Sequence, residues 1–176
     1  MHLNNKELPF QEIGDYPSTY SSTNILCRLI EGLGYRYYWA TASLNRSDLD
    51  YRPSDDSWTT LQIIEHIYGL SLALISTFHN KEFDFTQDSF NYHELREKTL
   101  CNFQFAHDKL IEDPKLNKLI IKLNMNGNHM TFPFWNHING PISDAIWHCG
   151  QVVTNRRASG NPIDSKVNVF IGKTMS

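Results

Sequence analysis

Four polar residues near the C-terminus have the spacing of a binding site. Asp144, His148, Gln151 and Asn155 follow one another at intervals of three or four residues. In an α-helix this spacing places all four within about 60° of one another, so they form one polar line along the helix. Apolar residues flank the line on both sides, whereas a solvated face would be flanked by lysine and glutamate. We therefore expect the line to point into the protein.

Asp144 and His148 are the members of this line that could hold a metal ion. Because they are four residues apart, their Cβ atoms stand about 6 Å apart on one face and the side chains can converge. His66, at the border of the apolar arc of an earlier helix, is the best candidate for a third ligand. Two imidazoles and one carboxylate would leave positions open for water or substrate, which is typical of a catalytic centre. Gln151 and Asn155 are then candidates for orienting a ligand or contacting substrate.

Each of these residues also has an ordinary structural explanation. An Asp and a His four residues apart are common on helices, and a buried hydrogen-bonded pair without metal would show the same spacing. His137, just before the helix, could support the ligands, contact substrate or simply belong to a loop. No E-x-x-H pair is present, which disfavours a di-iron carboxylate bundle. No H-E-x-x-H, P-loop, G-x-G-x-x-G or G-x-S-x-G motif is present either.

Other residues of the same helix have less specific features. Cys149 lies about 100° from the polar line, so we expect it to pack in the core and not to act as a nucleophile. Arg156 and Arg157 could meet an anionic substrate, although arginines at a helix C-terminus also favour the helix dipole. Gly150 in mid-helix costs about 1 kcal/mol relative to alanine, so we expect another helix to pack closely against it.

Four helices are predicted to position these residues. Apolar residues recur at helical spacing over 19–43, 58–78, 91–112 and 141–159. Asn91 followed by Glu94 predicts an N-terminal cap, while Pro141 and Gly160 mark the two ends of the last helix. Residues 1–18 form an irregular arm that can still pack on the helices. We predict an all-α fold with one domain over residues 1–176, a four-helix bundle with a small β-hairpin between helices three and four.

The hairpin is predicted over residues 119–134, where the apolar period changes from helix to strand. Asn126-Gly127 is the strongest short signal for a two-residue hairpin loop. Pro133 cannot donate to a sheet from an inner strand, so we expect a two-stranded flap that is not part of a larger sheet. The register that follows pairs Leu123 with Met130, Ile121 with Phe132, and Leu119 with Phe134.

Composition fits one globular domain in a reducing compartment. The chain has 176 residues, 40% of them hydrophobic and 20% charged, which is ordinary for a folded protein. A net charge of −3 and a pI near 6.2 provide no basic field for nucleic acid. Three cysteines without a CxxC spacing suggest neither disulfides nor a zinc knuckle. No signal peptide or stretch of roughly 18 apolar residues is evident, so we expect a cytoplasmic protein without membrane contact.

Two stretches of the sequence are informative together. One is SWTTLQIIEHIYGL, in which Trp58 leads to His66, and the other is ISDAIWHCGQVVTNRRASGNP around His148. They resemble the DinB/YfiT-like superfamily, in which a tryptophan-led second helix supplies one histidine. In that superfamily a fourth-helix segment of the form H-x-x-x-H-x-G-Q, closing with R-x-x-G-x-P, supplies two more. The resemblance covers roughly residues 20–165.

The resemblance implies that His66 and His148 are metal ligands and that Asp144 occupies the place of a third histidine. This departure leaves two alternatives, a carboxylate-substituted triad or a site that has lost its metal. We favour the altered triad because aspartate is itself a competent ligand. The implied cofactor is a divalent transition metal, zinc or nickel first, with manganese or iron as alternatives. Family members include thiol transferases and isomerases, so a low-molecular-weight thiol is a further implied cofactor.

Two functional hypotheses follow. The first is a metal-dependent thiol transferase or hydrolase acting on a small molecule, with His66, Asp144 and His148 as ligands. The second is a non-catalytic four-helix module whose polar line is a hydrogen-bonded core network used for binding or dimerisation. The family resemblance implies homodimers. An aromatic-rich first helix, with Tyr35 and Tyr37 among its residues, adds more apolar surface than one helical stripe buries.

Overall fold

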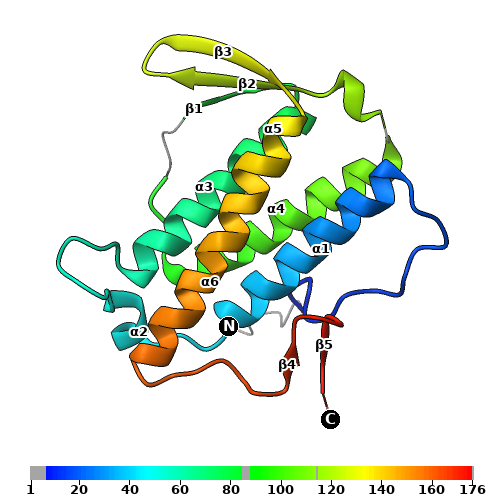
Figure 1. Cartoon of the computed structure of the whole chain (residues 1–176). Coiled ribbons are helices and arrows are strands. Elements are labelled where there is room, and N and C mark those ends of the chain that lie inside the picture. Colours follow the sequence, from blue (N-terminus) through cyan, green and yellow to red (C-terminus); the bar gives the residue numbers. More distant parts are fainter. Residues whose placement is uncertain (1–6, 85–87, 114, 176) are drawn as a thin grey trace, which may run out of the picture.

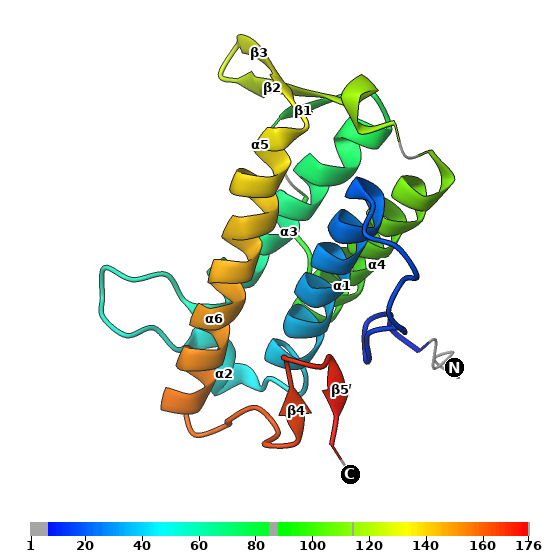
Figure 2. The same ribbon diagram turned by 45° about the vertical axis from the view of Figure 1, so that its right-hand side comes forward.

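Four long helices make up most of the protein. The computed structural model describes residues 7–84, 88–113 and 115–175. The long helices are α1 (Ser22–Ala40), α3 (Thr60–Phe78), α4 (Tyr92–Glu112) and α6 (Ser143–Ala158). Their axes run side by side in Figures 1 and 2, and each helix packs against two of the others. The four predicted helices are thus confirmed, with ends that differ by no more than a few residues.

The sequence signals at the helix ends are satisfied in the structure. At the start of α3, the Thr59 side chain accepts a hydrogen bond from the Gln62 N–H. The Gln62 side-chain oxygen in turn accepts one from the Thr59 N–H. Asn91 and Glu94 form the predicted reciprocal pair at the start of α4. Gly160 has φ of +96° directly after α6, as expected for the glycine that stops a helix.

The apolar faces of the four helices meet in one core. Each fully buried aliphatic or aromatic side chain contributes roughly 1.5–3 kcal/mol relative to an exposed one. We had expected Tyr35 and Tyr37 to add to an exposed apolar surface. Both are fully buried, so this expectation is wrong for these two residues. Other fully buried members of the core are Ile30, Leu33, Ile64, Ile67, Leu100, Ala145 and Val152.

A short helix, α2 (Arg46–Asp50), lies where the sequence predicted only a loop. Its start is capped by the Asn45 side chain, and the Asp48 carboxylate accepts in return from the Asn45 N–H. Asp48 is fully buried and also accepts from Ser159 and Asn161, beyond the end of α6. Contacts that are remote in sequence therefore stabilise this helix, which local periodicity does not reveal.

The flap is a three-stranded sheet at one end of the helices (Figure 1). β2 (Ile120–Met125) and β3 (Asn128–Pro133) form the predicted hairpin around Asn126-Gly127. The expectation of two strands is wrong, because β1 (Glu82–Asp84) pairs in parallel with β2. Pro133 lies on an edge strand as predicted. The pairs Leu123 with Met130 and Ile121 with Phe132 are confirmed, whereas Leu119 and Phe134 lie beyond the ladder.

The chain enters α6 through a kink. α5 (Trp135–His137) and the π-helical turn η2 (Ile138–Ile142) precede α6, and Gly140 has non-helical angles of φ −95° and ψ −109°. Pro141 follows directly and has no N–H to continue a helix from the preceding turn. α6 itself begins at Ser143, two residues after the start that the sequence predicted at Pro141.

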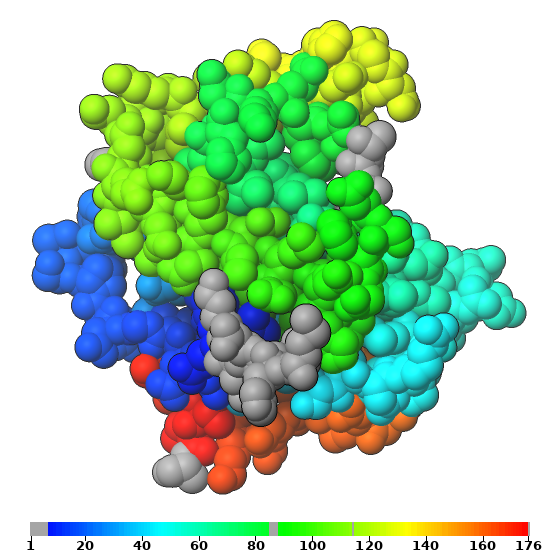
Figure 3. All heavy atoms as spheres, turned by 180° about the vertical axis from the view of Figure 1, so that it is seen from behind, coloured from blue at the N-terminus to red at the C-terminus, as the bar shows by residue number. Residues whose placement is uncertain are grey.

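The described part of the N-terminal arm packs against the C-terminal hairpin (Figure 3). In the described part of the predicted arm, the Phe10 ring lies so close to Gly34 that a Cβ there would come within 2.4 Å of it. The Ile13 N–H donates to the Gly172 carbonyl, in the turn between β4 (Val167–Asn168) and β5 (Lys173–Thr174). This small C-terminal hairpin was not predicted. Residues 1–6 of the arm lie outside the described residues.

Among the described residues, α3 is the one helix with the length and composition of a membrane span. We had expected no such stretch. Half of the apolar window, 50%, is buried inside the protein, and the core helix of a soluble protein passes the same test. The cytoplasmic location therefore stays a prediction.

Candidate metal centre

The three predicted ligands lie together between α3 and α6. His66 Nε2 is 3.1 Å from Asp144 Oδ2, and His148 Nε2 is 3.4 Å from Asp144 Oδ1. One nitrogen or oxygen from each residue lies within 4.8 Å of those of the other two. Among the described residues this is the one such group of histidine, cysteine and carboxylate side chains.

The helices place these side chains at the edge of the core and not inside it. His66 comes from the second turn of α3, while Asp144 and His148 occupy successive turns of α6, which packs beside it (Figure 2). The side chains of His66, Asp144 and His148 are 34%, 38% and 14% exposed. A satisfied core network would be closed to solvent, whereas this cluster can be reached by a small molecule.

Gln151 determines how His148 faces the cluster. Its Oε1 lies 2.7 Å from His148 Nδ1, and because an amide oxygen only accepts, Nδ1 carries the proton. Nε2 then faces Asp144 Oδ1 at 3.4 Å, where it either carries a second proton and donates to the carboxylate or offers a lone pair to a cation. The hydrogen bond from His148 to Gln151 is of the kind expected for the orienting role that the sequence suggested.

Trp58 covers the two imidazoles. Its ring stacks on His148 with centroids 5.9 Å apart and planes inclined by 19°, and it lies 5.2 Å from the His66 ring. The indole thereby restricts both ligand rings and excludes water from one side of them. The sequence motif contains Trp58, but its contact with the two imidazoles was not predicted. Its position could have indicated that contact, because Trp58 lies eight residues before His66 and positions seven or eight apart share a helix face.

A pocket of about 650 Å³ opens on the His148 side of the cluster, and we call it the polar pocket because serine, threonine, histidine and amide side chains line it together with apolar ones. Asn155 and Gln151 contribute to its lining, together with the exposed indole of Trp147. The Asn155 side chain is 3% exposed and donates to the Thr60 hydroxyl, so it holds the start of α3 against α6. Asn155 therefore has a structural role as well as a place beside the pocket.

A second pocket of about 340 Å³ lies on the other side, beneath the three-stranded sheet, and we call it the flap pocket. His66 and Asp144 are part of its wall, so it adjoins the same cluster. His137 is in the wall too and is fully buried, with Nε2 2.7 Å from the Thr77 hydroxyl. Burial lowers the pKa of His137 to about 4, so it is neutral near pH 7. It does not contact the three candidate ligands through any hydrogen bond described.

Three further expectations for α6 can be compared with the structure. Cys149 is buried in the core, and burial raises the pKa of its thiol to about 12, which is unsuitable for a nucleophile. Arg156 is 4% exposed and donates to the carbonyls of Trp39 and Ala40, so it is not available to an anionic substrate. The expected close helix packing at Gly150 is wrong, because a Cβ there would meet no atom within 4 Å.

Comparisons with known proteins add no relative. No protein-family model matches the chain, and searches of curated proteins and of solved structures found no match either. The chemistry of the site has to be inferred from its own geometry.

Proposed function

We propose that this protein is a metal-dependent enzyme that acts on a small molecule, with a divalent ion held by His66, Asp144 and His148. The observation that carries this proposal is the convergence of His66, Asp144 and His148, of which one ligand atom each lies within 4.8 Å of the other two. Zinc bonds of about 2.0–2.2 Å place tetrahedral ligand atoms roughly 3.3–3.6 Å apart. The two histidines approach different oxygens of Asp144, at 3.1 Å and 3.4 Å, and one ligand atom from each residue lies within 4.8 Å of the others, so small side-chain movements would bring the three to this spacing.

We also propose that the four long helices form a four-helix bundle of the DinB/YfiT-like kind. Support comes from the packing of α1, α3, α4 and α6 around one core, and from the positions of Trp58, His66 and His148. Asp144 takes the place of a histidine in that pattern. The two imidazoles make zinc or nickel the first choice, and the carboxylate of Asp144 leaves manganese or iron as alternatives.

The reaction would be of the hydrolase or transferase type. A divalent ion in such a site lowers the pKa of a bound water or thiol toward neutrality and polarises an electrophile. This chain's own residues keep the ligands in place: Gln151 fixes the His148 ring and Trp58 shields it from solvent on one face. Three protein ligands leave positions open for the reactants.

Water is a better candidate than an anionic thiol for the nucleophile. The described residues that line the polar pocket include no lysine or arginine, and Arg156 is engaged in the core. A low-molecular-weight thiol with carboxylate groups would therefore lack a cationic partner there. We accordingly place the hydrolase ahead of the thiol transferase. The partial exposure of the cluster also favours an enzyme over a closed, non-catalytic core network.

Metal content tests this function directly. Protein made without a histidine tag is incubated with zinc, nickel and manganese, passed over a desalting column and submitted to elemental analysis. We expect one ion per chain, lost in His148→Ala and strongly reduced in His66→Ala, because each removes one of three protein ligands. His129→Ala is the matched control, since His129 is 67% exposed and pairs with Glu82 on the sheet. No stoichiometric metal in the wild-type protein would overturn the proposal.

A further inference from the structure

The flap pocket joins an apolar enclosure to the proposed metal centre. Ile121, Leu123 and Phe132 project into its lining from the sheet, and Leu70 and Ala73 contribute from α3. His66 and Asp144 complete the wall on the side of the cluster. A molecule in this pocket therefore lies next to the metal ligands.

The lining determines the chemistry of an occupant. Asp144 is the one carboxylate among the described lining residues, and no lysine or arginine is among them. A charged substrate would lose its hydration without gaining a partner, apart from contact with the centre itself. An apolar body instead gains the favourable free energy of leaving water. The pocket thus favours an uncharged molecule with an aliphatic or aromatic body.

His137 supplies a polar position in this apolar wall. Its side chain is fully buried, Nε2 is paired with the Thr77 hydroxyl, and Nδ1 has no hydrogen-bond partner. Buried polar atoms are nearly always paired, and an unpaired one is costly. Solvent does not reach Nδ1, so a ligand hydroxyl or carbonyl would pair with it after a small shift of the wall, and a neutral imidazole nitrogen can then either donate or accept.

The two pockets divide the reactants between the two sides of the cluster. The polar pocket reaches His148, whereas the flap pocket reaches His66 and Asp144. Water can reach the cluster through the first pocket, and the more apolar lining of the flap pocket suits an apolar substrate on the other side.

We propose that the flap pocket is the substrate site, that it takes a compact uncharged molecule with an apolar body, and that His137 Nδ1 pairs with the single polar group of that molecule. This site rests on the proposed metal centre for its chemistry, but binding to it can be measured with or without the ion. Ile121, Leu123 and Phe132 act as the specificity surface. The kink at Gly140 and Pro141 closes the pocket on the α6 side.

The first test uses benzyl alcohol and ethylbenzene, which have the same shape and differ by a hydroxyl in place of a methyl group. Binding is followed by amide chemical shifts in nuclear magnetic resonance, with metal-free and zinc-incubated protein. Ala73→Phe should fill the flap pocket and weaken both probes at least tenfold, roughly the effect of losing one or two buried methylene groups. Thr154→Phe, which fills the polar pocket, is the matched control and should leave both affinities unchanged. Leu123→Trp is a second filling variant in case Ala73→Phe does not fold.

The second test concerns His137. Replacing it with phenylalanine keeps the ring and removes Nδ1, so the affinity ratio of benzyl alcohol to ethylbenzene should fall about fivefold, as expected for one lost hydrogen bond. A general loss of structure would weaken both probes equally and leave this ratio unchanged. An unchanged ratio in folded His137→Phe would overturn the assignment of His137. Equal effects of Ala73→Phe and Thr154→Phe would overturn the pocket.

The two proposals can fail separately. Probe binding to the flap pocket in a protein that takes up no metal would contradict the proposal of a metal-dependent enzyme and support the proposal of an apolar binding site. Stoichiometric metal together with probe binding outside the flap pocket would keep the metal centre and exclude this substrate site.

Discussion

Gln151 is the residue through which the proposed metal centre is most easily tuned. Its Oε1 lies 2.7 Å from His148 Nδ1, and the hydrogen bond between them directs Nε2 toward Asp144. Such supporting hydrogen bonds typically change metal affinity by about 10–100-fold when they are removed. Gln151→Leu should therefore weaken zinc binding by about this factor, measured by competition with a chromophoric chelator.

Gln151→Glu is the matched control for that experiment. It retains an acceptor oxygen at the same place, so zinc binding should be at least as tight as in the wild-type protein. Equal weakening by leucine and glutamate would show that Gln151 acts by packing and does not orient His148.

Gly150 provides a stability prediction at a single residue. Its Cβ position is open, whereas a Cβ at Gly34 would clash with the Phe10 ring. Gly150→Ala should stabilise the protein by about 0.5–1 kcal/mol, because alanine loses less backbone entropy in a helix. Gly34→Ala should destabilise it. Urea unfolding with an unchanged m-value measures both, and destabilisation by Gly150→Ala would show that this position is packed after all.

Three residues of the candidate metal centre were predictable because they share one face of α6. Asp144, His148 and Gln151 follow from helical spacing, and His66 follows from its place at the border of an apolar arc. The role of Arg156 was not predictable in this way. Its acceptors are carbonyl groups at the end of α1, more than a hundred residues earlier, and spacing within one helix says nothing of them.

Arg156 connects three elements and provides a prediction at their scale. Its guanidinium donates to Trp39 and Ala40 at the end of α1 and to Asn161 after α6. Arg156→Met leaves these carbonyl groups without their charged donor, which should cost roughly 2–4 kcal/mol. Arg157→Met is the matched control because Arg157 is exposed, and its effect should stay within about 0.5 kcal/mol. Similar midpoints of urea unfolding for the two variants would contradict the bridging role.

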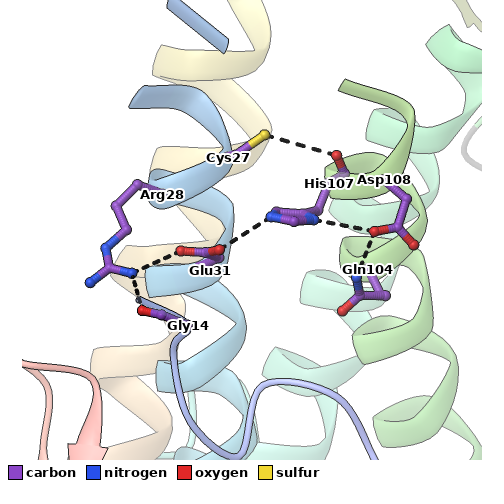
Figure 4. Close-up of polar contacts among 7 residues, drawn as sticks. All are labelled: Gly14, Cys27, Arg28, Glu31, Gln104, His107 and Asp108. Atoms are coloured by element: carbon purple, nitrogen blue, oxygen red, sulfur yellow. Dashed lines mark hydrogen bonds and ion pairs between the residues drawn. The ribbon is translucent and has the colours of Figure 1, made fainter. Parts of the chain in front are cut away.

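A polar cluster connects α1 to α4 on another side of the helices (Figure 4). His107 lies between two carboxylates, 3.2 Å from Glu31 and 3.2 Å from Asp108, and Arg28 donates to Glu31 at 3.0 Å. The hydrogen bond with Glu31 raises the pKa of His107, against the effect of burial. Burial alone would raise the pKa of Glu31, but its hydrogen bonds with His107 and Arg28 outweigh this and lower it.

This cluster predicts how stability depends on pH. Because its pKa is raised in the folded protein, His107 adds its full stabilisation below the unfolded pKa of 6.5. This stabilisation is lost as pH rises through the folded pKa. Because its pKa is lowered in the folded protein, Glu31 adds its full stabilisation above the unfolded pKa of 4.5. This stabilisation is lost as pH falls through the folded pKa. The free energy difference between wild type and His107→Gln should thus be larger near pH 6 than near pH 9. A difference that does not vary with pH would show that the ion pair contributes nothing.

Elements with strong local signals were predicted, and those that depend on tertiary contacts were not. The caps at Thr59 and Asn91, the turn at Asn126-Gly127 and the stop at Gly160 are local, so their helices and hairpin were found. β1 is three residues long and becomes a strand only by pairing with β2, nearly forty residues later. Helix α2 likewise depends on distant partners of its buried carboxylate.

The exposed apolar residues that could support the predicted homodimer are not the ones that the sequence suggested. The first helix buries Tyr35 and Tyr37, so its aromatic content does not call for a partner. Tyr16, Tyr20 and Ile25 are instead exposed by 78%, 99% and 58% around the start of α1. Exposed apolar patches of this kind mark interaction sites in many proteins. We expect a homodimer, and light scattering that gives 20.5 kDa at micromolar concentration would contradict it.

Metal binding should stabilise the whole molecule, because the ligands come from two helices that separate on unfolding. Asp144 and His66 face each other across α3 and α6, so an ion that binds only the folded protein adds to the free energy of unfolding. At a hundredfold excess over the dissociation constant the gain is about 2.7 kcal/mol. For a chain of this length it corresponds to a rise in Tm of roughly 5–10 °C.

Protons compete with the ion for the imidazole nitrogens, so this gain should shrink below about pH 6. Melting curves with and without chelator, at about pH 7.5 and about pH 5.5, measure the effect at both limits. His148→Ala serves as the control, since its Tm should not respond to chelator at either pH. If metal-containing wild-type protein melts at the same temperature with and without chelator at the higher pH, the ion is bound elsewhere and does not join α3 to α6.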